Sequence, residues 1–291
     1  MVSRGDFLQT SAMAGALIAQ NPVSPGKLKM RWFGGGVYEL ATLDDRAIVL
    51  VDAWLWNNTG WTAFNAAKPP ELASAAAYAT HLESRNPQAV FVALTHDHGD
   101  HMGDYFELLP ALVAAGLPVM TGGQSDLFRV GLVPKFKAAN LDMATLVVNK
   151  GAGMNFGGHA AHGAIEAHLV PAVHSTALAY PAAGFVLDVA GTRVYASGDT
   201  DLFGDMAMIG SRYRPHIAVL STGNGAFTMG PGDAAQACAL LKAPHAVPVH
   251  YAHNALVLGT NCGDLFRAAV AKVSPHTAVT VMRPGETVTL A

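Results

Sequence analysis

Three histidines and two aspartates crowd into one short stretch of the chain, THDHGDH, directly after an apolar run. His96, Asp97, His98, Asp100 and His101 fall within six residues and follow AVFVAL, which is typical of a buried strand. Imidazoles and carboxylates this close must either face water or hold something positive. An HxHxDH match arises by chance in roughly one such sequence in a thousand. We therefore expect a metal-binding loop rather than a solvated polar loop.

The spacing within this loop predicts how its side chains divide. His96 and His98 lie two residues apart, so an extended chain points both the same way. The glycine after them permits a sharp turn, which lets Asp100 and His101 reach the other side of the same place. We expect Asp97 to point away and to hold backbone amides of the loop. The loop therefore predicts two adjacent sets of ligands.

Apolar segments of strand length alternate with helix-forming segments in two similar halves. With 51% hydrophobic residues, the chain can fill one large core or two fused halves. We expect strands within 27–34, 47–52, 89–94, 118–121, 167–173, 184–190, 192–199, 216–221, 245–250, 278–282 and 286–290. We expect helices within 69–84, 103–116, 201–210, 230–242 and 262–273. This order predicts an α/β fold in which two mixed sheets pack face to face under outer helices, as a single domain over 26–291.

Two local signals mark where elements turn or begin. DVAGTR predicts a hairpin turn with Gly191 at its tip. Pro231 suits the first turn of a helix, and Asp233 is favourable near the positive end of that helix dipole.

The THDHGDH loop resembles the signature loop of the metallo-β-lactamase superfamily. PAVHS, YASGDTDLFGDM and AVPVHY follow in order and resemble that superfamily's later metal motifs. GFVLDVAGTRVYASGDTDLFGDM and NGAFTMGPGDAAQACALLKAPHAVPVHY are similar to a narrower branch, metal-dependent hydrolases of uncertain substrate akin to L-ascorbate-6-phosphate lactonase. The resemblance covers nearly all of residues 27–291 and implies an αββα sandwich.

The resemblance also implies a ligand set for two divalent metal ions. One ion would be bound by His96, His98 and His174, the other by Asp100, His101 and His250, with Asp199 bridging both. The set contains no sulfur ligand, so we expect Zn first, with Mn, Fe, Co and Ni also compatible. Asp100 and Asp199 are the expected catalytic residues, Asp100 by passing a proton to the leaving group.

The expected chemistry is hydrolysis. Two ions roughly 3.5–4 Å apart share a water and lower its pKa toward about 7. Two carboxylates and a bridging hydroxide leave about +1 at the centre, which favours a small, anionic substrate. We expect this hydroxide to cleave a small ester, a lactone or a phosphoester. The alternatives are a phosphodiesterase of the N-acyl phosphatidylethanolamine-cleaving type and a metal-binding protein without catalysis.

Other polar residues carry weaker expectations. Asp52 ends a strand and could support a ligand from behind, and His253 could reach the mouth of the site. The histidines of the Gly/Ala-rich stretch are expected not to be ligands; they are His159, His162 and His168.

The pocket walls are expected to come from loops. The Trp-rich segment 53–68 and the segment 221–230 are the candidates, with Asn224 and Thr228 as polar contacts. Arg212 and Arg214 could meet a phosphate, although two arginines on a loop are usually solvated.

Composition excludes several partners. The net charge is -3 and Lys and Arg form no run, which argues against nucleic acid. Cys238 and Cys262 are expected to be small core residues. No segment is long enough to span a membrane. Residues 1–25 resemble a twin-arginine leader in which Arg4 takes the first arginine position and Gly5 the second, so we expect a periplasmic protein or, alternatively, a cytoplasmic one. The sequence does not determine the oligomeric state, and a homo-oligomer is one possible state because related enzymes often self-associate.

Overall fold

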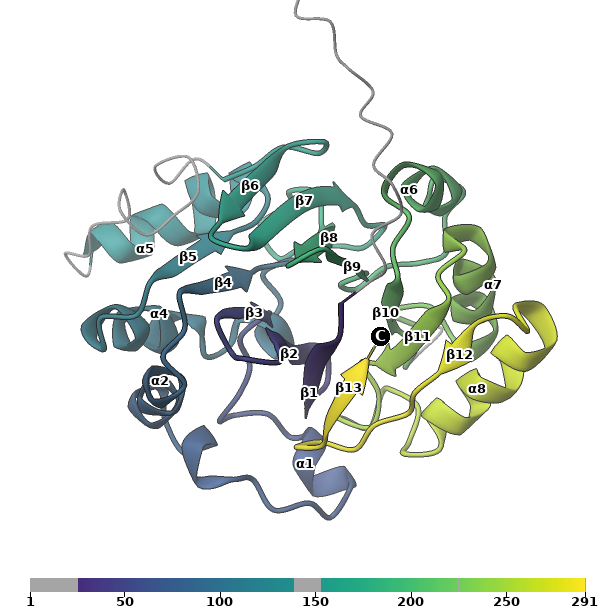
Figure 1. The fold of residues 1–291 in the computed structure, drawn as a ribbon, viewed down its shortest axis with the longest axis horizontal. Helices are drawn as coiled ribbons and strands as arrows, with labels where there is room; N and C mark the ends of the chain where they lie inside the picture. The colour runs from purple at the N-terminus through teal and green to yellow at the C-terminus, as the bar shows by residue number, and fades with distance from the viewer. Residues whose placement is uncertain (1–25, 139–152, 224–225, 291) are drawn as a thin grey trace, which may run out of the picture.

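The computed structural model describes residues 26–138, 153–223 and 226–290, so the leader-like segment 1–25 and Asn224 lie outside the described residues. Two β-sheets pack face to face and helices cover both outer faces (Figure 1), which is the αββα sandwich expected from the sequence.

The first sheet runs in the order β13-β1-β2-β3-β4-β5. Its strands are β1 (Leu28–Gly34), β2 (Val37–Thr42), β3 (Ala47–Val51), β4 (Ala89–Ala93), β5 (Val119–Gly122) and β13 (Thr287–Leu290). The second sheet runs in the order β12-β11-β10-β9-β8-β7-β6. Its strands are β6 (His159–His162), β7 (Ile165–Pro171), β8 (Ala183–Val189), β9 (Thr192–Ala196), β10 (Ile217–Ser221), β11 (His245–Val249) and β12 (Ala278–Val279).

The helices divide between the two outer faces. The first half carries α1 (Gly60–Ala63), a 3-10 turn (Pro70–Leu72), α2 (Ala75–Ser84), α3 (Gly99–Met102), α4 (Tyr105–Ala114), a π-helical segment (Leu127–Leu132) and α5 (Val133–Ala138). The second half carries α6 (Met206–Tyr213), α7 (Pro231–Leu241) and α8 (Cys262–Val273). In Figure 1, α2 and α4 lie against one sheet and α6, α7 and α8 against the other.

Strand alternation builds the layers. On β3, Val49 faces the second sheet in the central core, whereas Ile48 and Leu50 face outward under α2 and α4. The buried parallel strands have two apolar faces, which is why they read as continuous apolar runs in the sequence. A third cluster covers the outer face of the second sheet, where Cys238 on α7 and Phe266 on α8 are buried against the strands. Cys238 is thus a small core residue, as expected.

Several predicted boundaries need correction. The helix predicted from residue 69 begins only at Ala75, because Ser74 caps it by accepting a hydrogen bond from the Ala77 amide at 3.2 Å. The helix predicted over 201–210 begins at Met206, because the Asp201 amide bonds to the Val173 carbonyl at 3.0 Å and ties this stretch to another loop. The strand predicted over 278–282 is limited to residues 278–279.

Other local predictions are confirmed. The hairpin between β8 and β9 turns at Gly191, with φ of +88° there and +51° at Ala190, as its tight turn requires. Helix α7 starts at Pro231 and carries Asp233 in its first turn. Helix α8 spans Cys262–Val273, the range predicted.

Both sheets present the carboxyl ends of their parallel strands to the same functional region. Strands β3, β4 and β5 are parallel in the first sheet, and β9, β10 and β11 are parallel in the second. Open α/β sheets bind ligands just beyond such strand ends. No helix within 26–138, 153–223 or 226–290 is long and apolar enough to cross a bilayer.

Candidate metal centre

Each predicted ligand stands just beyond the end of a strand. The histidine loop follows β4, His174 follows β7, Asp199 follows β9, and His250 follows β11 directly. His250 has a φ of +62°, a left-handed conformation that a residue with a Cβ rarely adopts. Strain of this kind is concentrated at functional sites, where the surrounding structure enforces it.

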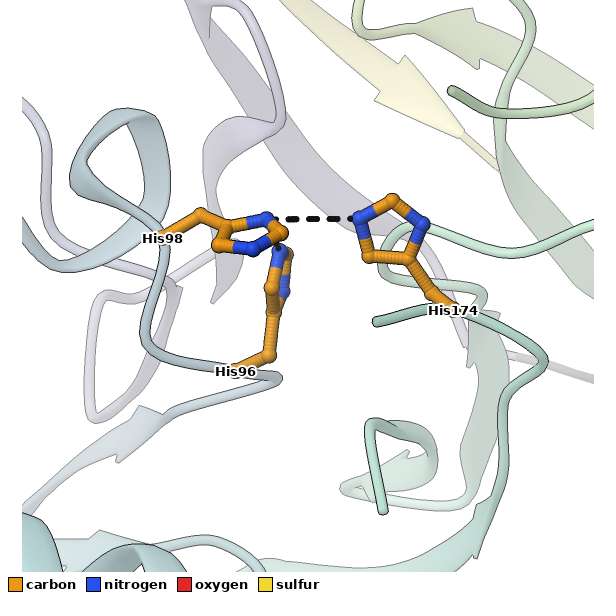
Figure 2. A group of neighbouring side chains, drawn as sticks. All are labelled: His96, His98 and His174. Carbon is orange, nitrogen blue, oxygen red and sulfur yellow. Dashed lines mark hydrogen bonds between the residues drawn. The ribbon is translucent and has the colours of Figure 1, made fainter. Parts of the chain in front are cut away.

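Three imidazoles form the first group of the centre. His96 Nε2 lies 3.0 Å from His98 Nδ1, and His174 Nε2 lies 3.3 Å from the same atom. Figure 2 shows a ring nitrogen of His98 and one of His174 turned toward one another, although the two residues are 76 positions apart in the chain. Donors that surround one Zn ion at 2.0–2.1 Å are about 3.4 Å apart in a tetrahedron. The spacing of these nitrogens therefore suits a single cation.

A second group is built from Asp100, His101 and His250, whose potential ligand atoms all lie within 4.8 Å of one another. His250 Nε2 is 3.4 Å from Asp100 Oδ2. Asp199 connects the two groups, because its Oδ2 is 3.3 Å from His101 Nε2, 3.1 Å from His250 Nε2 and 3.8 Å from His174 Nε2. The structure thus brings together all seven residues singled out from the sequence.

Unpartnered buried atoms give a test of whether a cation fits here. Among the described residues, His101 Nε2 and both ring nitrogens of His250 are buried without a hydrogen-bond partner. Buried polar atoms are normally paired, so each unpaired one calls for an explanation. A cation between the imidazoles and the carboxylates would satisfy the Nε2 atoms of His101 and His250, and the residues present therefore fit a metal site.

The protonation of the group follows from burial and mutual charge. Burial alone would raise the pKa of Asp199, yet the neighbouring His250 and His101 hold that pKa below its usual range, so Asp199 is a carboxylate. Burial lowers the pKa of His96, and His101 lowers it further, so the His96 ring is neutral. Metal ligands require these states.

His101 differs from His96 because it lies between two carboxylates. Although burial opposes it, Asp199 and Asp52 raise the pKa of His101 well above its ordinary value. A proton on Nε2 would thus occupy the place that a cation takes between His101 and Asp199.

Asp52 orients two ligands from behind. Its Oδ2 accepts a hydrogen bond from His101 Nδ1 at 2.7 Å and another from the Thr95 hydroxyl at 2.8 Å. The Thr95 oxygen lies 3.0 Å from His96 Nδ1, and since its proton points to Asp52, it accepts from that nitrogen. Both histidines are thereby fixed in the tautomer that leaves Nε2 free for a metal.

Asp97 points away from the cluster, in line with the sequence analysis, but the amides that it holds lie in another loop. Its carboxylate accepts from the Ala177 amide at 2.8 Å and from the Leu178 amide at 3.0 Å. These amides follow His174 closely in the chain. Asp97 therefore positions the loop that carries His174 relative to the histidine loop.

A glycine turn between β1 and β2 packs against the centre, and the sequence analysis did not single it out. The Gly35 carbonyl accepts from the His250 amide at 2.7 Å. A Cβ at Gly36 would lie 2.6 Å from His101 Cε1, closer than real Cβ atoms come. The run of three glycines was the available signal, because close backbone approach demands residues without a Cβ.

The other candidate histidines fall into two places, one at the centre and one away from it. His253 Nε2 lies 3.3 Å from Asp100 Oδ2 at the cleft, so His253 does reach the site. His159 and His168 lie outside the centre, on β6 and β7, where they form a partly exposed group with Glu166 whose ligand atoms are within 4.8 Å of one another.

A cleft of about 570 Å³ opens onto the metal centre. Of the expected tryptophan wall, Trp54 lines it, whereas Trp61 is buried in the core below α2 and α4. From the segment 221–230, Phe227 lines the cleft and Thr228 does not. The remaining lining residues are Thr59, His98, Asp100, His174, Ser175, Asp199, His250, His253, Asn254, Leu256 and Val257.

The family model described as a beta-lactamase superfamily domain matches residues 49–251. The chain belongs to the metallo-β-lactamase superfamily. It is similar to the UPF0173 metal-dependent hydrolase of Archaeoglobus fulgidus, 31% identical over 268 residues that cover 89% of this chain and 97% of that protein. The corresponding protein of Thermofilum pendens is 32% identical over 261 residues, with coverages of 89% and 97%.

Solved structures agree with the fold of this superfamily. Igni18, a metallo hydrolase from Ignicoccus hospitalis, is similar with a TM-score of 0.68 at 25% identity over 91% of this chain and 99% of that one. The metallo-beta-lactamase fold protein YhfI from Bacillus subtilis gives a TM-score of 0.63 at 13% identity, over 91% and 100% of the two chains. The chain is a metal-dependent hydrolase of this superfamily.

Proposed function

We propose that this hydrolase cleaves a small ester, a lactone or a phosphoester, at a centre of two divalent ions, with Zn expected first. The observation that carries the proposal is the place of Asp199, whose Oδ2 lies within 3.3 Å of His101 and His250 in one group and 3.8 Å from His174 in the other. One carboxylate placed in this way suits two neighbouring cations better than one.

The metal ions would supply a hydroxide nucleophile at neutral pH and polarise the ester carbonyl or phosphoryl oxygen. The side chain of Asp199 is 4% exposed and lies at the floor of the cleft as a carboxylate. The Asp100 side chain is 31% exposed at the cleft and lies 3.3 Å from His253 Nε2. We propose that Asp100 receives a proton and passes it to the leaving oxygen, since a general acid must be within hydrogen-bond reach.

The proposal is tested by metal analysis and a substrate panel on the full chain. Because the group on β6 and β7 also offers ligands, metal content is measured in the His159→Ala/His168→Ala background, where we expect two ions per chain. A panel of lactones, phosphomonoesters, phosphodiesters and an N-acyl phosphatidylethanolamine is assayed with chelated protein and after addition of Zn or Mn.

Asp199→Ala is expected to lower turnover by more than about a hundredfold, because a metal ligand should matter at least as much as the groups that support it. The matched control is Asp205→Ala, since Asp205 is exposed and its side chain caps no amide. Full turnover by Asp199→Ala, or no metal-dependent turnover of any ester, would contradict the proposal.

A further inference from the structure

The mouth of the cleft is apolar, although its floor is made of histidines and carboxylates. Leu256 is 65% exposed and Phe227 is 47% exposed, and both line the cleft together with Trp54 and Val257. Large apolar side chains that are exposed side by side mark binding surfaces in soluble proteins.

The loop that presents Leu256 is held in shape by hydrogen bonds. The Leu258 amide donates to the Gly223 carbonyl at 2.6 Å, and the Ala252 amide donates to the Leu258 carbonyl at 2.8 Å. The Asn254 side chain accepts from the Leu256 amide at 2.8 Å, which closes the turn. Leu256 is therefore presented to the cleft by a preformed turn, and binding against it costs little ordering.

The charge of the residues that line the cleft also favours an uncharged ligand. None of the described residues that line the cleft is a lysine or an arginine. The two arginines that could have met a phosphate are elsewhere: Arg212 lies over the Tyr213 ring at 4.9 Å, and neither Arg212 nor Arg214 lines the cleft. Apart from bound cations, an anionic substrate would meet mainly Asp100 and Asp199 here.

We propose that the substrate is an uncharged carboxylic ester, such as a lactone, that carries an apolar chain. The ester group lies over Asp199 and His250, and the chain runs outward along Trp54, Phe227 and Leu256. The cleft volume of about 570 Å³ is in the range that encloses a drug-sized ligand, so it exceeds the need of a bare lactone ring. The inference rests on the proposed function and selects the lactone over the phosphoester.

The test uses the metal-loaded full chain and γ-lactones with side chains of increasing length, from γ-butyrolactone to γ-decanolactone. Each added methylene that leaves water raises kcat/KM by up to about fourfold. We expect about twofold per methylene, because the mouth is open on one side. Bis-(p-nitrophenyl) phosphate is assayed beside the series and is expected to be the poorer substrate.

Leu256→Ser and Phe227→Ser are expected to flatten the dependence of kcat/KM on chain length. The matched control is Leu265→Ser on α8, because Leu265 is 46% exposed but does not line the cleft, and its slope should equal that of the unaltered protein. A flat series in the unaltered protein, or faster cleavage of the phosphodiester, would overturn this inference while leaving the proposed function standing. Absence of turnover on every ester would overturn both.

Discussion

Replacing Gly36 with alanine is expected to weaken binding of the metal ion at His101. The added Cβ would lie 2.6 Å from Cε1 of the His101 ring, whereas ordinary contacts begin at 3.4 Å, so the ring or the turn must move by about 0.8 Å. The ring cannot yield freely, because Asp52 holds its Nδ1 at 2.7 Å. Metal sites tolerate ligand displacements of only about 0.2 Å.

The displacement is comparable to the loss of a group that orients a ligand, which typically costs 10–100-fold in metal affinity. We therefore expect a chelator to remove the ion at His101 from Gly36→Ala at a concentration about tenfold to a hundredfold lower than from the unaltered protein. Competition with a chromophoric chelator measures this. Gly232→Ala is the control, because nothing lies within 4 Å of a Cβ at that position. Equal affinities in both variants, with both folded by circular dichroism, would refute the reasoning.

Four further outcomes are expected. Asp52→Asn should lower metal affinity by about tenfold to a hundredfold in the same chelator competition, because the amide offers His101 a weaker partner; unchanged affinity would count against its positioning role. Asp97→Ala should lower kcat/KM by about tenfold in a lactone assay, because the loop carrying His174 loses two hydrogen bonds to a carboxylate. Leu108→Ala should reduce the free energy of unfolding by about 2–5 kcal/mol in urea titrations, since Leu108 on α4 is fully buried against the first sheet. Chelation of the metal should lower the melting temperature. Metal added back at a hundred times Kd should restore about 2.7 kcal/mol of stabilisation. Identical melting curves with and without metal would argue against ligands held in the folded centre.

The sequence predicted those parts of the centre that depend on local spacing. The HxHxDH loop has its geometry set by a strand end and one turn, and the later ligands each follow an apolar strand. Their order along the chain, which resembles the later metal motifs of the superfamily, was enough to expect that they meet. The αββα architecture was predictable for the same reason, as the buried strands are continuous apolar runs.

The parts that could not be predicted depend on contacts between distant segments. Asp97 binds amides 80 and 81 residues further along, which no local turn rule anticipates. The Gly35–Gly36 turn contacts His250 and His101 only because β1 and β2 join the same sheet as β3 and β4. Strands β2 and β6 were missed because pairing with neighbours, more than composition, defines them.

Because the predicted ligands are spread along the chain, the metal centre is completed late in synthesis. His96, His98, Asp100 and His101 leave the ribosome early, but His250 follows about 150 residues later. At 5–20 residues per second, synthesis of that interval takes on the order of ten seconds. During this time the nascent polypeptide displays an incomplete binding site, and a newly made enzyme cannot turn over substrate before β11 has docked and brought in His250.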